Sequence, residues 1–226
     1  TGRLSVGSKS PLTGGIKESN AGGTVSQRLA RLGVRAIIIE GEPSNGIYFL
    51  RVDDKGVKIE SAEELKGLRT YGTVDKLVSR YGEEIGILCI GPAGEMLLPT
   101  AIIASTDEER RPSRCAGRGG LGAVLGAKGI KAIVVEARDG ISIEALDKEL
   151  LREAIRSEIA PFFLRIGKAL HDNTQSYLVK WINSVGGLPT RNFSRGKFEG
   201  AEKISGEAIT KLISERGGKV GLPCHR

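Results

Sequence analysis

Residues 112–137 of the chain read PSRCAGRGGLGAVLGAKGIKAIVVEA. It places Arg114 and Arg118 among closely spaced glycines and ends in the run KAIVVEA. Short β-branched runs next to glycine-rich turns are typical of buried strands. Glycine lets another group approach the backbone closely, and arginine presents a fork of hydrogen-bond donors. The turn before the strand is therefore suited to an anionic group.

The same pattern occurs earlier in the chain. When Gly23 is placed on Gly119, GTVSQRLARLGVRAIIIEG falls on GGLGAVLGAKGIKAIVVEA. Each copy reads as a glycine-rich turn, a short helix, a glycine stop and a buried strand. Such a unit directs backbone N–H groups and the positive end of a helix dipole at the turn, so two copies predict two anionic groups. Either turn alone is equally well explained as an ordinary turn whose glycines take positive φ.

GRGGLG, residues 117–122, also resembles the glycine-rich fingerprint of dinucleotide-binding folds. In those folds a strand leads directly into the glycine loop, whereas EERRPSRC precedes the loop in this chain. The sequence context therefore argues against a dinucleotide fold.

Periodicity divides the chain into a strand-rich first part and a helical second part, with the boundary at about residue 140. The first part contains two short helical patterns, one starting at Val25 and one starting at Val74. The fold class predicted is α+β. The expected strands are residues 35–41, 46–53, 85–91 and 131–137, and the expected later helices are residues 143–159, 162–181 and 206–216.

Composition limits the partners. The 226 residues are 39% hydrophobic and 27% charged, which is typical of a globular chain. The net charge is +7, but lysine and arginine are scattered among aspartate and glutamate, and few aromatic residues are present to stack on bases. Nucleic acid is therefore not expected as a partner. No apolar run approaches the roughly 20 residues of a membrane helix, so no membrane partner is expected either.

Three widely spaced cysteines and no secretory leader indicate a reducing, cytoplasmic location. The chain starts without methionine, its single methionine is Met96, and it stops at GLPCHR just after Cys224. We therefore expect a piece of a longer protein, with part of the first domain missing before Thr1.

Several separate motifs in order resemble one family over essentially the whole chain. SPLTGGIKESNAGG, RCAGRGGLGAVLGAKGIKAIVV, GLPTRNF and the terminal LPC are similar to the tungsten-containing aldehyde:ferredoxin oxidoreductases. The resemblance implies that residues 1–140 form two β-rich halves related by a pseudo-twofold axis, which cradle tungsten or molybdenum held by two pterins. It implies that residues 141–226 begin a helical domain, truncated at the first iron–sulfur ligand.

The resemblance also implies site residues. Arg3 is similar to an arginine that contacts a pterin, and Cys224 to a ligand of a 4Fe–4S cluster. Magnesium between the pterin phosphates would take backbone carbonyls of Asn20 and Ala116. Cys115 is not expected to bind tungsten through its side chain, because the metal is held by pterin sulfur. One cofactor loop comprises Asn20, Ala21, Gly22 and Gly23, and the other comprises Arg114, Cys115, Ala116, Gly117, Arg118, Gly119 and Gly120.

The implied reaction is oxidation of an aldehyde to a carboxylic acid, with electrons leaving through the cluster to ferredoxin or another electron-transfer subunit, in a homo- or hetero-oligomer. No catalytic residue is expected in this fragment, and the sequence does not distinguish among aldehydes. An alternative from another class is a non-catalytic domain that binds a phosphorylated small molecule through the same two loops. A C-x-x-C-x-x-x-C continuation after Arg226 would favour the enzyme.

Overall fold

The computed structural model describes residues 2–41, 46–137, 145–162 and 175–218. The chain divides into two compact units, Thr1–Ile143 and Glu144–Arg226. Helices and strands are mixed along the chain, which confirms the predicted α+β class.

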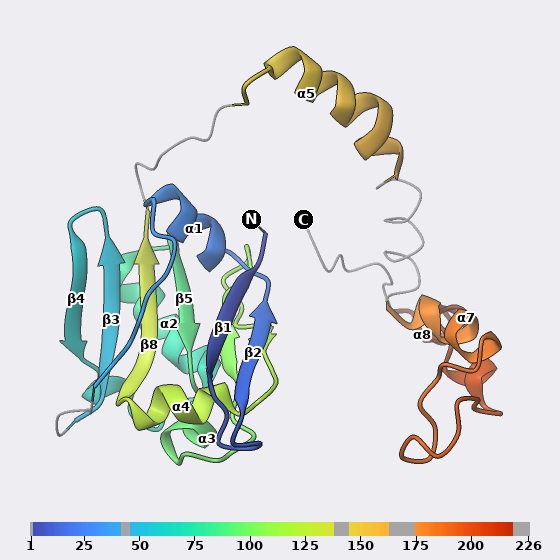
Figure 1. Ribbon diagram of the computed structural model, residues 1–226, viewed down its shortest axis with the longest axis horizontal. Helices are drawn as coiled ribbons and strands as arrows, with labels where there is room; N and C mark the ends of the chain where they lie inside the picture. Colours follow the sequence, from blue (N-terminus) through green and yellow to red (C-terminus); the bar gives the residue numbers. More distant parts are fainter. Residues whose placement is uncertain (1, 42–45, 138–144, 163–174, 219–226) are drawn as a thin grey trace. The chain divides into compact units, whose positions relative to one another are not determined.

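A six-stranded mixed sheet forms the centre of the first unit, in the order β4-β3-β8-β5-β6-β7 (Figure 1). Strands β3 and β8 are parallel, and the other neighbouring pairs are antiparallel. The last strand of the unit along the chain therefore lies in the middle of the sheet, between β3 and β5. The strands are β3 Tyr48–Asp53, β4 Gly56–Ser61, β5 Ile85–Cys89, β6 Ile103–Ser105, β7 Arg114–Ala116 and β8 Ile130–Glu136.

Side chains of β8 alternate between the two faces of the sheet, which explains why helices cover both faces. Ile133 and Val135 belong to one core cluster, together with side chains of α1 and α4, whereas Ala132 and Val134 belong to a second cluster with α2. Successive strand residues point to opposite faces, so one apolar run can fill both cores. The helices are α1 Val25–Arg31, α2 Thr70–Tyr81, α3 Pro92–Glu95 and α4 Leu121–Ala127, with a short 3-10 turn at η1 Glu63–Leu65.

Strands β1 Leu4–Lys9 and β2 Ile16–Ala21 form a separate antiparallel hairpin on the α1 and α4 side, in the register Leu4↔Ala21 to Lys9↔Ile16. Ala21 enters the core shared by α1 and α4, at 2% exposure. The polar sequences of these strands gave no apolar run, and neither strand was predicted.

Two glycines of α4 serve packing rather than ligand approach. A Cβ on Gly126 would overlap the carbonyl oxygen of Gly94 in α3, and a Cβ on Gly122 would overlap the carbonyl oxygen of Ile102. Small residues one turn apart therefore let α4 lie directly against neighbouring backbone.

The sequence repeat is visible in the helix bounds. Helices α1 and α4 both contain seven residues and begin 96 positions apart, which is the spacing between Gly23 and Gly119. The stop glycines match as well, with φ of +70° at Gly33 and +68° at Gly129.

The strand predicted at residues 35–41, in the first copy of the repeat, is wrong. Residues 34–40, the counterpart of β8, belong to neither sheet. Ile37 and Ile39 are partly buried against the core, whereas Ile38 is 80% exposed. Strand β8 is held by β3 and β5 on its two sides, and within the described residues the first copy has no neighbouring strand to pair with.

The second unit contains helices joined by turns in its described residues, together with one isolated antiparallel bridge between Thr190 and Arg195. Helix α8 Gly206–Glu215 confirms the helix predicted at 206–216, and α5 Lys148–Ala154 continues into a π-helical turn, η2 Ile155–Ile159, starting five residues later than predicted. The helix predicted at 162–181 falls mainly outside the described residues, apart from η3 Gln175–Tyr177 and α7 Leu178–Ser184. Asp147 and Ser205 cap α5 and α8 by accepting hydrogen bonds from Leu150 N and Ala208 N.

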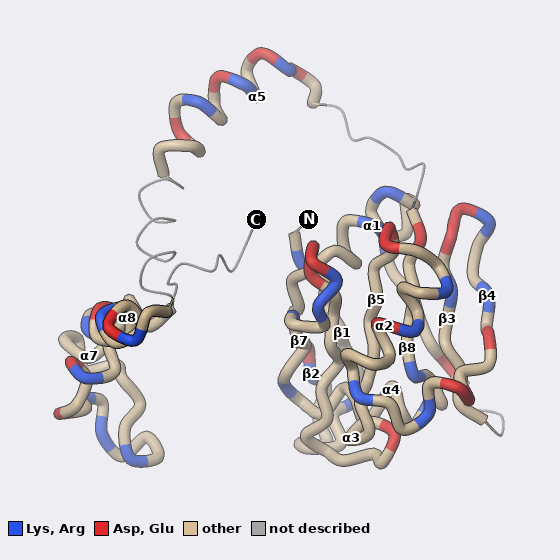
Figure 2. The backbone as a smooth tube through the Cα atoms, turned by 180° about the vertical axis from the view of Figure 1, so that it is seen from behind, with Lys and Arg blue, Asp and Glu red and all other residues tan. Residues whose placement is uncertain are grey.

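Charges of both signs are interspersed along the described chain. Basic and acidic residues alternate on α5 and around β3 and β4 (Figure 2). This is the scattered pattern expected from the sequence.

Candidate functional site

The two glycine-rich loops predicted to bind a cofactor lie side by side. The first begins with the last residues of β2, at Asn20, and the second begins with β7, at Arg114. The backbone N–H of Arg118 donates to Ser19 Oγ at 3.3 Å, which joins the second loop to the end of β2. Thr24 N donates to the carbonyl of Thr106 at 2.9 Å and anchors the far end of the first loop. Segments almost a hundred residues apart therefore form one surface.

A third segment, the turn at residues 10–15, supports this surface. Ser10 is 1% exposed, and its hydroxyl donates to the carbonyl of Gly119 at 2.6 Å. The same oxygen accepts hydrogen bonds from Leu12 N and Thr13 N at 3.1 and 3.2 Å. Sequence reasoning did not single out Ser10 or Ser19, because a serine gives no local sign of a partner 109 or 99 residues away.

The predicted glycines fall into two groups. Gly23, Gly119 and Gly120 have φ of +101°, +79° and +70°. A Cβ would overlap the Thr106 carbonyl at Gly23 and the Pro99 carbonyl at Gly120, and at Gly119 it would overlap the side chain of Lys17. The fold itself therefore requires these three glycines.

Gly22 and Gly117 behave differently. The nearest atom to an added Cβ is Arg114 Cδ at 3.9 Å for Gly22 and the Cys115 carbonyl oxygen at 3.9 Å for Gly117. Nothing in the described protein crowds these two positions. They are the places where this surface leaves the backbone open to another molecule.

Cationic and polar side chains surround the open positions. Arg118 and Asn20 are exposed, and Arg114 is half-buried. Asn20 Nδ2 donates to Glu18, which also accepts a hydrogen bond from Ser5 Oγ at 2.7 Å.

Arg3 lies at the same end of the β1–β2 hairpin as the first loop. It is exposed and comes directly before Leu4, which pairs with Ala21. Arginine guanidinium groups together with accessible backbone N–H groups are suited to binding phosphate-like groups.

The residues between the arginines are poor metal ligands. Burial raises the pKa of the Cys115 thiol, which keeps it protonated near neutral pH. Ala116 is 1% exposed and packs into the core, so it could contribute only its backbone. Among the described residues, no group of three His, Cys, Asp or Glu side chains could hold a metal ion. Cys224 lies outside the described residues.

Asp107 organises the loop that leads into β7. Its Oδ1 accepts hydrogen bonds from Glu109 N at 3.0 Å and Arg111 N at 2.9 Å, and its Oδ2 accepts from Ser113 Oγ at 2.8 Å and Arg111 Nε at 3.2 Å. Burial alone would raise the pKa of Asp107, but the hydrogen bonds from Ser113 and Arg111 outweigh it and lower the pKa. Sequence patterns did not identify this residue.

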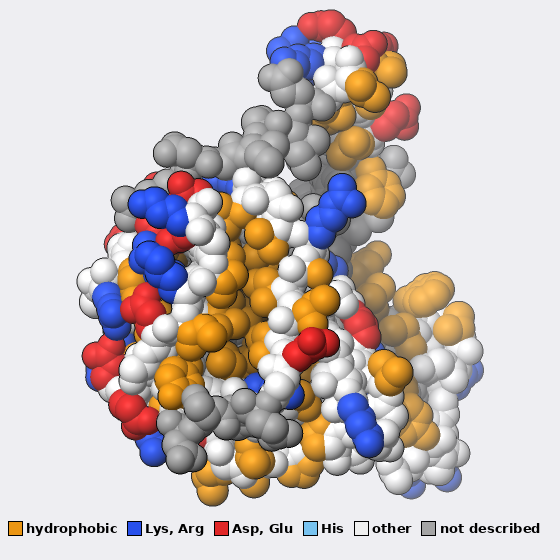
Figure 3. Space-filling view, turned by 60° about the vertical axis from the view of Figure 1, so that its left-hand side comes forward, with side chains coloured by type: hydrophobic (Ala, Val, Ile, Leu, Met, Phe, Trp, Pro, Cys, Tyr) orange, Lys and Arg blue, Asp and Glu red, His pale blue; other side chains and the backbone are white. Residues whose placement is uncertain are grey.

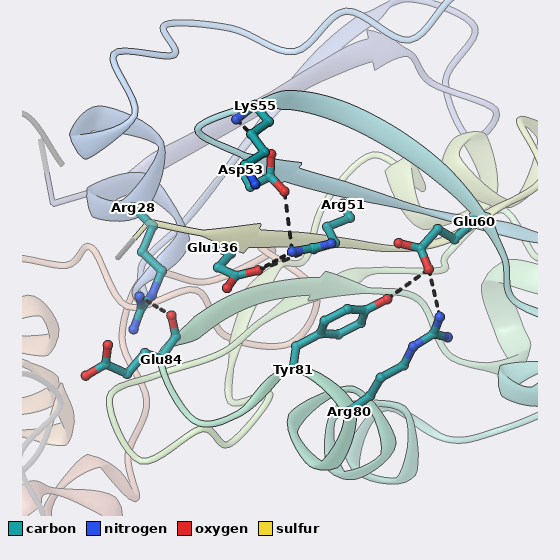
Figure 4. Close-up of polar contacts among 9 residues, drawn as sticks. All are labelled: Arg28, Arg51, Asp53, Lys55, Glu60, Arg80, Tyr81, Glu84 and Glu136. Carbon is teal, nitrogen blue, oxygen red and sulfur yellow. Dashed lines mark hydrogen bonds and ion pairs between the residues drawn. The ribbon is translucent and has the colours of Figure 1, made fainter. Parts of the chain in front are cut away.

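A second polar cluster is structural. Arg51 of β3 pairs with Glu136 of β8 at 2.8 Å and with Asp53 of its own strand at 3.4 Å, and Tyr81 donates to Glu60 at 2.9 Å (Figure 4). Burial, followed by the hydrogen bond to Glu60, raises the pKa of Tyr81 to about 12. These side chains satisfy one another, so the cluster is not a candidate site.

The loop surface is therefore suited to an anionic ligand. It offers two open glycines and several arginines, and the described residues around it offer no set of protein metal ligands. None of the described helices combines the length and apolar character needed to cross a membrane.

Two family descriptions match the chain. "Aldehyde ferredoxin oxidoreductase, N-terminal domain" matches residues 1–137, and "Aldehyde ferredoxin oxidoreductase, domains 2 & 3" matches residues 162–226.

Two named proteins of the same family are similar to the chain. A tungsten-containing aldehyde ferredoxin oxidoreductase of Pyrococcus abyssi is 39% identical over 92% of this chain and 33% of its own length. The protein of the same name from Pyrococcus horikoshii is 38% identical over 92% of this chain and 33% of its own length. The chain spans about a third of the length of these relatives.

Among solved structures, the active site complex BamBC of benzoyl coenzyme A reductase, in complex with 1,5-dienoyl-CoA, has a similar fold. The TM-score is 0.66 at 23% identity, over 94% of this chain and 34% of the other.

Proposed function

Because the chain belongs to the aldehyde ferredoxin oxidoreductase family, we propose that it forms part of the cradle for a tungsten or molybdenum bis-pterin cofactor. The complete protein then oxidises an aldehyde and water to a carboxylic acid, releasing two electrons and two protons. The electrons leave through a 4Fe–4S cluster to ferredoxin or another electron-transfer subunit. Within the cradle, the bound cofactor supplies the redox chemistry and its own sulfur ligands for the metal.

The observation that carries this proposal is the meeting of the two repeated loops. Their junction is the hydrogen bond from Arg118 N to Ser19 Oγ, and each loop contributes one open glycine, Gly22 or Gly117. Two equivalent loops suit two pterins. We therefore propose that the loops belong to two pseudo-twofold related halves within residues 1–140.

The roles of individual residues follow from their position. Arg118, Arg114 and Arg3 bind pterin-associated phosphate or polar edge groups, because all three belong to or adjoin the loops that carry the open glycines, and guanidinium groups suit such ligands. Asn20 and Ala116 offer backbone carbonyls to magnesium. Among the remaining loop residues, Gly23, Gly119 and Gly120 shape the cradle, because an added Cβ at any of them would overlap neighbouring atoms. Ala21 and Cys115 complete the two loops.

The rest of the proposal concerns the wider molecule. Residues 141–226 begin a helical domain, and Cys224 is the first protein ligand of the cluster. We place the protein in the cytoplasm, because Cys89 and Cys115 are free thiols. The oligomeric form is a homo- or hetero-oligomer.

The test uses the full-length protein and measures tungsten, molybdenum and pterin per chain. Gly22→Val and Gly117→Val should each lower cofactor content severalfold, because a side chain would fill the open space in front of the backbone. Gly72→Val on α2 is the matched control, since an added Cβ there meets only Leu68 at 4.0 Å. Full cofactor content in both loop variants would contradict the proposed cradle.

Arg118→Ala tests the charge of the cradle. A charge-assisted hydrogen bond contributes about 1.5–3 kcal/mol, so the variant should release cofactor roughly 10- to 150-fold more readily. A native protein that contains neither tungsten nor molybdenum, and that binds phosphorylated compounds with the same loops, would support the non-catalytic alternative.

A further inference from the structure

The ammonium group of Lys131 lies in the interior of the first unit, away from the surface formed by the two cofactor loops. Lys131 belongs to the central strand β8 and is 0% exposed. Its Nζ donates to the carbonyl of Leu68 at 2.8 Å and to the carboxylate of Glu95, whose other oxygen accepts from Gly67 N at 2.8 Å. Taking two charges out of water is costly, and apolar residues in place of a buried ion pair often give equal stability. A role in positioning therefore explains this pair better than a role in stability.

Lys131 holds both ends of the segment 90–95, which contains α3. At one end, the backbone carbonyl of Lys131 accepts a hydrogen bond from Ile90 N at 3.0 Å. At the other end, its ammonium group binds Glu95, the last residue of α3. The central strand of the sheet thus fixes where α3 lies.

The side chains just after α3 contribute little to this anchoring. Three consecutive apolar residues are largely exposed, at 69% for Met96, 50% for Leu97 and 43% for Leu98. Figure 3 shows hydrophobic side chains on the surface at the lower end of the first unit, the end where α3 and α4 lie in Figure 1. The position of α3 therefore depends on backbone contacts and on the Lys131–Glu95 pair.

The turn that follows α3 lies directly behind the second cofactor loop, residues 114–120. A Cβ on Gly120, the last residue of that loop, would overlap the carbonyl of Pro99, and the carbonyl of Ala101 accepts a hydrogen bond from Gly122 N at 3.0 Å. Leu97, between α3 and these carbonyls, has a φ of +57°, a conformation that persists only where the surrounding structure fixes it. A shift of α3 would therefore be transmitted through a rigid turn to the loop.

We propose that the Lys131–Glu95 pair is a positioning device for the second cofactor loop, which it fixes through α3 and the turn behind Gly120. The counterpart of Lys131 in the first copy of the repeat is Arg35, which is exposed, so the device serves the second loop alone. The effect on the loop is independent of the cofactor, whereas its consequence for cofactor retention rests on the proposed function.

The test separates positioning from stability in the full-length protein. The double variant Glu95→Gln/Lys131→Met removes both charges, so its urea denaturation should stay close to that of the wild type. Exchange of the Gly122 amide, measured relative to amides of β8, should become about 10-fold faster or more, as expected for loss of a charge-assisted contact. The ¹H–¹⁵N signals of Gly119 and Gly120 should shift.

Two further variants make the result decisive. Val52→Ala, next to Val135 at the opposite end of β8, is the control, because it lowers global stability without touching α3 and should leave the relative exchange of Gly122 unchanged. Glu95→Asp keeps the charge and moves the carboxylate by one methylene, so the same glycine signals should shift by less. Unchanged glycine signals and unchanged Gly122 exchange in the Glu95 variants would overturn the proposal.

Cofactor retention is measured separately, as pterin and tungsten per chain after dialysis. The double variant should lose pterin roughly 10-fold more readily than the wild type, and Arg35→Met should retain it. Wild-type retention in the double variant would overturn the link between the pair and the cofactor. A full-length protein without any pterin would contradict the proposed function, while the glycine measurements would still decide whether the pair positions the loop.

Discussion

Asp107 holds the loop before β7 through one carboxylate, and its removal should loosen that loop measurably. In Asp107→Ala, the backbone N–H groups of Glu109 and Arg111 lose a charged acceptor at 3.0 and 2.9 Å. Each such bond contributes about 1.5–3 kcal/mol, but solvent can replace part of it because both donor residues are exposed. We therefore expect the free energy of local opening to fall by about 2–4 kcal/mol.

Amide hydrogen exchange of the full-length protein measures this change residue by residue. A fall of about 2–4 kcal/mol corresponds to exchange roughly 30- to 700-fold faster at Glu109 and Arg111. Asp107→Asn keeps one acceptor oxygen but presents an amide to Arg111 Nε, so its effect should be about half as large in free energy. Asp75→Ala, on the exposed side of α2, is the control and should leave these amides unchanged.

The pH dependence gives a second measurement on the same loop. The pKa of Asp107 is lowered in the folded protein, so its contribution to stability is complete above the unfolded-state pKa near 4 and is lost as pH falls through the folded-state pKa. After correction for intrinsic rates, the wild-type loop should open more readily below about pH 4, and Asp107→Ala should lack this change. Equal protection of Glu109 and Arg111 in wild type and Asp107→Ala would refute the reasoning.

Three further predictions concern packing, a buried ion pair and the cluster ligand. Gly126→Val should lower the thermal denaturation midpoint by an amount equivalent to at least about 1–3 kcal/mol, because its side chain would overlap the carbonyl of Gly94; an unchanged midpoint would show that α4 can shift freely. Glu95→Gln should destabilise the protein by about 3–5 kcal/mol in urea, because it leaves the fully buried ammonium of Lys131 without its carboxylate, and adding Lys131→Met should restore most of the loss. Cys224→Ser should remove the cluster absorption and lower bound iron, and unchanged iron content would contradict its assignment as a ligand.

The central elements of the fold were predictable because their signals are local. Strands β3, β5 and β8 are apolar runs between turns, and α1 and α2 carry apolar stripes at helical spacing. Strands β6 and β7 contain three residues each, and β1 and β2 are largely polar, so no periodicity distinguishes them from loops. Residues 34–40 have the composition of a strand but lack a neighbouring strand among the described residues. Amino-acid composition alone does not show whether a neighbouring strand is available.

The candidate site was predictable only in outline. The repeat identified both loops, since duplication is visible in the sequence. It could not separate Gly22 and Gly117, which are open, from Gly23 and Gly119, which the fold requires, because the distinction depends on contacts with Thr106, Lys17 and other distant residues. Ser10, Ser19 and Asp107 were missed for the same reason.

The position of β8 determines the order in which the first unit can assemble. Strand β3 pairs only with β4, and β5 to β7 form a separate group, until β8 enters between β3 and β5. During synthesis, the edges of β3 and β5 that pair with β8 therefore stay unpaired until residue 136 has left the ribosome. The β3–β8 contact joins residues about 80 positions apart, and such pairings form slowly. The nascent chain therefore exposes these unpaired strand edges, which are prone to aggregation, until β8 is available.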